Sequence, residues 1–99
     1  MKVLTTFEIK KGFDRWLHLV NVDLKPFLKK YKFKVHFACC DENEKKVYDL
    51  SEMEDPTMLD EFMKDEEIHK LRTEAGVEIS SQEVISVIKK FEILDVGNN

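Results

Sequence analysis

The sequence predicts a single α+β domain in which strands and helical segments follow one another in the order β-α-β-β-α-β. Two stretches, 3–9 and 33–39, alternate apolar and polar residues with the period of a half-buried strand. Two others, 13–31 and 55–76, repeat apolar residues at helical spacing and carry helix start and stop signals. We therefore expect one four-stranded antiparallel sheet with both helical segments on one face.

The composition is typical of a soluble globular chain. Its 99 residues suffice for one core, and we expect a single domain over 1–99, ordered from about 2 to 95. Hydrophobic residues make up 42%, and the formal charge of −4 opposes binding to nucleic acid. No run approaches a membrane-spanning length, and the N-terminus lacks the apolar centre of a signal peptide. We expect a cytoplasmic protein that binds neither nucleic acid nor membrane.

The first strand is predicted over 3–9, and its core face carries Val3, Thr5, Phe7 and Ile9. A helix follows from Phe13, with the lone Trp16 on its apolar face as a core residue. Pro26 lacks a backbone N–H, so we expect a break near 21–23 and a second short helix capped by Asp23.

A β-hairpin is predicted next. The second strand, 33–39, is expected to turn Phe33, Val35, Phe37 and Cys39 toward the core. The polar group 41–44 forms the turn, and a third strand covers 45–50. In the expected register Phe37 lies opposite Tyr48, and on the other face His36 lies opposite Asp49.

The second helical segment has clear boundaries. Asp55 is placed as N-cap with Pro56 in the first turn, a kink is expected at 65–66, and Gly76 ends the helix. The tail 83–94 fits two structures, because 80–83 matches a capping box while its β-branched residues favour a strand. We expect a strand, since a fourth strand completes the sheet.

This order of elements is that of the ferredoxin-like plait, which leaves one face of its sheet bare. On that face the sequence predicts a semi-apolar surface that includes Leu4, Thr6, Ala38, Cys40 and Val47. A second copy of the chain is the simplest cover for such a face.

Two pairs of short stretches carry a resemblance to known proteins. DPTMLDEF at 55–62, followed by AGV at 75–77, resembles the second half of the dimeric α/β-barrel superfamily, which includes antibiotic-biosynthesis-monooxygenase-like and stress-responsive barrel proteins. FEI at 7–9 with FDRW at 13–16 is similar to a family of short, functionally uncharacterised bacterial proteins in that superfamily. The resemblance implies a homodimer packed sheet to sheet with a small cavity in each half, and it implies no particular reaction.

One pair of residues is expected to carry acid–base chemistry. A carboxylate beside an imidazole fixes its tautomer and raises its pKa, so His36 and Asp49 are the candidate catalytic residues. The residues expected to share their face and bind a ligand are Thr6, Glu8, Ala38, Cys40 and Val47. The alternative is a cross-strand polar pair that only supports dimer contact.

No cofactor or metal site is expected. His18, His36 and His69 have no ligand spacing, and the adjacent Cys39 and Cys40 are expected to be reduced thiols. Three functions stay open: a homodimer that binds a small, partly apolar organic molecule with any chemistry cofactor-independent, a noncatalytic module for self-association or protein docking, and redox sensing by the two cysteines.

Overall fold

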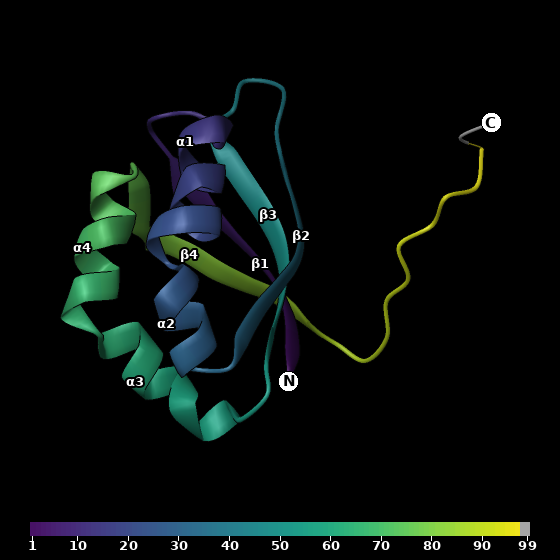
Figure 1. The fold of residues 1–99 in the computed structure, drawn as a ribbon. Helices are drawn as coiled ribbons and strands as arrows, with labels where there is room; N and C mark the ends of the chain where they lie inside the picture. The colour runs from purple at the N-terminus through teal and green to yellow at the C-terminus, as the bar shows by residue number, and fades with distance from the viewer. Residues whose placement is uncertain (98–99) are drawn as a thin grey trace.

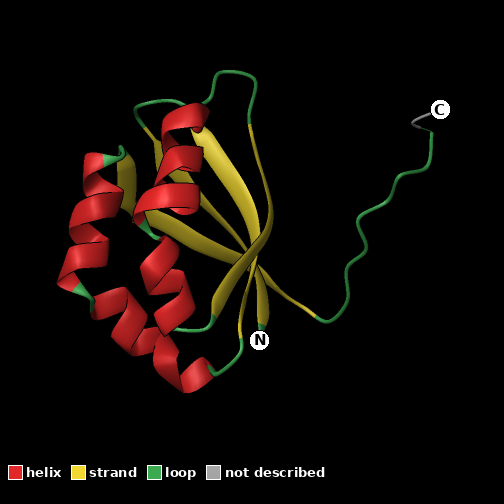
Figure 2. Ribbon diagram, viewed as in Figure 1, coloured by secondary structure: helices red, strands yellow, loops and turns green. Residues whose placement is uncertain are grey.

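The computed structural model describes residues 1–97 and has an α+β fold with a four-stranded antiparallel sheet of order β2-β3-β1-β4. The strands are β1 (Lys2–Ile9), β2 (Phe33–Cys40), β3 (Lys46–Met53) and β4 (Val77–Ile88). All the helices of the described part of the chain lie on one side of the sheet, as Figures 1 and 2 show. This arrangement is compatible with a ferredoxin-like plait.

The helical segment between β1 and β2 is broken as expected. It consists of α1 (Phe13–His18), the π-helical turn η1 (Leu19–Asp23) and α2 (Lys25–Lys30). The Leu24 N–H donates to the Leu19 carbonyl at 2.8 Å, a spacing of five residues that closes the π turn just before Pro26. The expected cap is wrong: Leu24 takes the N-cap position of α2, and Asp23 instead forms an ion pair with Arg15 at 3.5 Å.

The segment between β3 and β4 confirms the expected cap and kink. It consists of the 3₁₀ turn η2 (Pro56–Met58), α3 (Leu59–Lys64) and α4 (Glu66–Glu74). The Asp55 carboxylate accepts the Thr57 N–H at 3.0 Å. At the kink, Asp65 leaves the helical conformation and its carboxylate accepts the N–H groups of Glu67 and Ile68, so one side chain caps α4.

The core lies between the sheet and the helices. Phe7 and Trp16 pack with ring centroids 5.8 Å apart, and Trp16 is 3% exposed, which confirms it as a core residue. The other buried members of the core come from every layer of the fold: Ile9, Leu19, Leu24, Tyr31, Val47, Met53, Phe62, Ile68, Ala75 and Val77.

The expected register of the hairpin is wrong from the turn onward, because Cys39 and not Phe37 lies opposite Tyr48, and an irregularity at His36 shifts the pairing once more. Val35 pairs with Ser51, but Phe37 pairs with Leu50, so the residue between them has no partner across the ladder. A residue inserted in this way reverses the alternation of the strand beyond it. Phe33 and Val35 pack against the core as expected, whereas Phe37 is 43% exposed and Ala38 takes its place beneath the helices.

The last strand also begins earlier than expected. β4 starts at Val77, directly after Gly76, and ends at Ile88, so the strand prediction is confirmed for 83–88 and wrong for 89–94. The stretch 77–82, which precedes the predicted strand, also belongs to β4. Residues 89–97 extend beyond the end of β4 (Figure 1), and the Phe91 ring of this segment contacts His36. Residues 98–99, beyond the expected ordered part, lie outside the described residues.

Within residues 1–97, no helix is both long enough and apolar enough to cross a membrane.

Gly76 provides a test of the close approach between β1 and the end of α4. Its φ is +92°, and a Cβ at this position would lie 2.9 Å from the Lys11 backbone nitrogen. Gly76→Ala should lower the free energy of unfolding by about 1–3 kcal/mol, measured by urea denaturation. Gly97→Ala is the matched control, because Gly97 has a similar φ of +88° with nothing within 4 Å. Equal losses in both variants would contradict the proposed steric origin.

Candidate functional site

A cavity of about 420 Å³ lies between the sheet and the helices. Most of its wall is apolar, and it is formed by side chains such as Phe7 from β1, Trp16 from α1, Leu19 from η1 and Phe62 from α3. This volume is within the range of cavities that hold small organic molecules.

The cavity reaches solvent where the helices stop covering β4. Val84 and Val87 line it, yet they are 60% and 65% exposed. Met1 and Met63, which are 43% and 39% exposed, line the same cavity. These four apolar side chains therefore form a mouth between the sheet and the end of α3.

The first polar feature of the wall is a pair on the two central strands. Thr5 and Asp49 are opposite one another in the β1–β3 ladder, and the Thr5 hydroxyl donates to Asp49 Oδ1. Asp49 is only 7% exposed, and burial raises the pKa of its carboxyl above the ordinary value despite the Thr5 hydrogen bond and the charge of Arg72. The site thus holds a carboxyl group that retains its proton to higher pH than an exposed aspartate.

The second polar feature joins α4 to β4. Arg72 donates from Nη2 to Gln82 Oε1, and its guanidinium carbon lies 5.5 Å from the centre of the Phe7 ring. The charges of Arg72 and Asp49 attract one another, but no ion pair joins them in the described part of the chain. A cation and a carboxyl therefore share one largely apolar cavity without direct contact.

A bulge in β4 brings Gln82 to this position. Thr6 pairs with Glu83 and Glu8 pairs with Glu78, so four residues of β4 lie across from the single Phe7 of β1. Ser81 closes this bulge, because its Oγ accepts the Glu8 N–H at 2.8 Å and donates to the Glu78 carbonyl. This extra length allows β4 to contribute a polar side chain beside Arg72.

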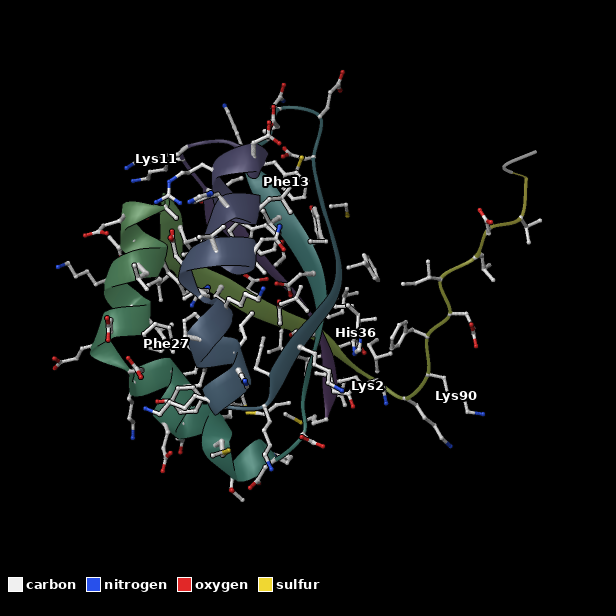
Figure 3. The ribbon with its side chains drawn as sticks, in the orientation of Figure 1. Lys2, Lys11, Phe13, Phe27, His36 and Lys90 are labelled. Carbon is white, nitrogen blue, oxygen red and sulfur yellow. The ribbon has the colours of Figure 1, made fainter. Side chains whose placement is uncertain are left out.

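The structure does not bring the two candidate catalytic residues together. Asp49 pairs with Ala38 across the ladder and lines the cavity. His36 lies on the side of the sheet away from the helices (Figure 3), where its Nε2 is 2.8 Å from Glu52 Oε1. This hydrogen bond is the largest cause of a lowered pKa at Glu52. The expected pairing of His36 with Asp49 is therefore wrong, and its carboxylate partner is Glu52.

The five expected ligand-binding residues divide between the two faces. Ala38 packs against the core, Cys40 shares its face of β2, and Val47 is fully buried in the core. Thr6 is 4% exposed and donates to the Val47 carbonyl, while Glu8 is exposed near the end of β1. The expectation that all five share the open face is therefore wrong, because the bulge in β2 and the register of β3 turn three of them toward the helices.

The cysteines and histidines form no further centre in this part of the chain. Cys39 and Cys40 are free thiols, and burial raises the pKa of the Cys40 thiol. Among residues 1–97, no group of three or more His, Cys, Asp and Glu side chains is placed to hold a metal ion.

Arg72 and Gln82 were not expected in the site from the sequence. Arg72 follows Ile68 by four residues and precedes Ala75 by three, so it occupies the apolar face of its helix. A cation at a core position is a signal for a buried polar site that sequence analysis could have used. Gln82 carries no such signal, since its position depends on the bulge.

The chain matches no protein-family model, no curated protein sequence and no solved structure.

Replacing Asp49 tests whether burial disfavours the ionised form of its carboxyl. Because its folded-state pKa is raised, wild-type stability should fall as pH rises from the unfolded-state pKa of about 3.9 through the folded-state pKa. Asp49→Asn has no ionised form, so its free energy of unfolding relative to wild type should increase with pH across that window. Urea denaturation at a series of pH values measures this difference.

Asp55→Asn is the control of opposite sign. Hydrogen bonds from Thr57 lower the Asp55 pKa, so its carboxylate stabilises the fold above the unfolded-state pKa and loses this effect as pH falls. The Asp55 variant should be less stable than wild type at neutral pH and approach it in acid. A pH-independent difference for Asp49→Asn would contradict the assignment of a raised pKa.

Proposed function

We propose that this chain binds a small, largely apolar organic molecule in the cavity between the sheet and the helices. The observation that carries the proposal is the cavity itself, about 420 Å³ in volume, with an apolar wall and a few convergent polar groups. Such a combination is the usual form of a small-molecule site, because apolar walls supply affinity and a few polar groups fix orientation.

The polar groups support chemistry without a cofactor. Asp49 is buried, hydrogen-bonded to Thr5 and has a raised pKa, which suits a carboxyl that transfers a proton to or from a bound molecule. Arg72 supplies a positive charge in the same cavity. Any acid–base step is thus assigned to Asp49, with His36 on the other face of the sheet.

A tryptophan at the mouth tests whether molecules enter this cavity. N-phenylnaphthylamine, a neutral fluorescent probe, should bind the wild-type chain with a rise in emission. Val87→Trp should weaken binding about tenfold or more, because a bulky ring at the mouth overfills the entrance.

Val22→Trp is the matched control for that experiment. Val22 is 54% exposed and does not line the cavity, so this variant should bind the probe as the wild type does. Equal binding by wild type and Val87→Trp would place the probe elsewhere and contradict the proposed site.

A second candidate function is self-association through the open face of the sheet, as a homodimer. The observation that favours it is the segment after β4. Its first part is held at Phe91, whose ring centroid lies 4.5 Å from that of His36. Beyond this contact it carries Ile93, Leu94 and Val96, which are 70%, 74% and 87% exposed. Apolar side chains so displayed on an extended segment are suited to packing on a second copy of the chain.

Sedimentation equilibrium tests this second candidate. The wild-type chain should sediment with twice the chain mass, and Leu94→Asp should shift the population toward monomer because a charge is then placed at the contact. Val22→Asp, on the helical side of the fold, should leave the mass unchanged. A wild-type monomer at all accessible concentrations would exclude the dimer.

A further inference from the structure

The charges in the cavity specify which end group its ligand carries. Arg72 lines the cavity, and burial lowers its pKa without removing its charge, since a guanidinium stays protonated in proteins. In the described part of the chain its hydrogen-bond acceptor is Gln82 Oε1, a neutral atom. A guanidinium has five N–H donors, so donors remain for a further acceptor.

The carboxyl group in the same wall does not neutralise this cation directly. Asp49 Oδ1 accepts from Thr5, and no ion pair joins Asp49 to Arg72 among residues 1–97. Two separated charges in an apolar cavity are both poorly solvated. Arg72 is therefore a cation whose direct partners in this wall are a neutral amide oxygen and an aromatic ring.

We infer that the molecule bound in this cavity is an apolar compound with a single carboxylate, which pairs with Arg72. This inference rests on the proposed function and adds the chemical class of the ligand. The charge of the ligand then balances that of Arg72 in direct contact. A neutral ligand would leave Arg72 without a counter-ion, and a cationic ligand would add a second positive charge.

The geometry of the remaining wall agrees with this class. The guanidinium carbon lies 5.5 Å from the centre of the Phe7 ring, and a guanidinium is suited to a planar, two-oxygen acceptor. The side chains at the mouth, Met1, Met63, Val84 and Val87, are all apolar. The N-terminal ammonium of Met1 donates to the Met53 carbonyl at 2.8 Å. One anionic group with an apolar body matches both regions.

Three probes with the same tail and different head groups test the inference. Octanoate, octanol and octylamine are titrated into the full-length chain by isothermal calorimetry. Octanoate should bind roughly ten- to hundredfold more tightly than octanol, as expected for a charge-assisted hydrogen bond, and octylamine should bind most weakly.

Variants of the two arginines assign the preference. Arg72→Met keeps much of the side-chain length without the charge, and it should reduce octanoate affinity to the level of octanol while leaving octanol within a few-fold of wild type. Arg15→Met is the matched control, because Arg15 lies outside the cavity wall and pairs with Asp23, and it should change neither affinity. If Arg72→Met does not fold, the affinities of the wild-type chain for the three probes still test whether the cavity prefers a carboxylate.

The outcomes separate the two proposals. Binding of octanol or octylamine as tight as octanoate overturns the carboxylate inference and leaves the proposed apolar site in place. An octanoate preference that survives Arg72→Met also overturns it. Absence of binding by all three probes, together with no binding of N-phenylnaphthylamine, overturns both the carboxylate inference and the proposed function.

Discussion

The pairing of β1 with β3 determines which side chains lie beneath the helices. These central strands pair without irregularity from Lys2 opposite Glu52 to Glu8 opposite Lys46, whereas both outer pairings are interrupted. The regular ladder fixes Thr5 and Asp49 side by side on the covered face. The two outer strands pair irregularly with this central ladder. The irregularity of β4 brings Gln82 to the cavity, and that of β2 places Ala38 under the helices.

Much of the fold could be predicted from local signals. The break before Pro26, the cap at Asp55, the kink at Asp65 and the stop at Gly76 all follow from backbone chemistry at single residues. The core face of β1 was also predictable, because that strand alternates without interruption. The limits of β4 were not, because its valines and isoleucines suggest burial but Val84, Ile85 and Val87 are 50–65% exposed.

The site was predicted only in part, and the reason is the burial of β3 on both faces. Val47 and Leu50 point to opposite sides of the sheet, yet they are 0% and 2% exposed. Hydrophobic alternation therefore gives no indication of which side of β3 faces the helices. In β2 the unpaired residue His36 determines which of the following side chains face the helices, and the sequence carries no signal for such a bulge. Asp49 was identified as a site residue but placed on the wrong face.

The position of β4 has a consequence for regulation. This strand borders the mouth of the cavity through Val84 and Val87, and it leads directly into the segment 89–97, which carries the exposed Ile93, Leu94 and Val96. A molecule held at the mouth and a second chain that holds the segment would act on the same strand. Where one binding event changes the conformation of β4 that the other requires, the two binding free energies are linked. Such linkage is reciprocal: whatever factor occupancy of the cavity applies to association, association applies to occupancy.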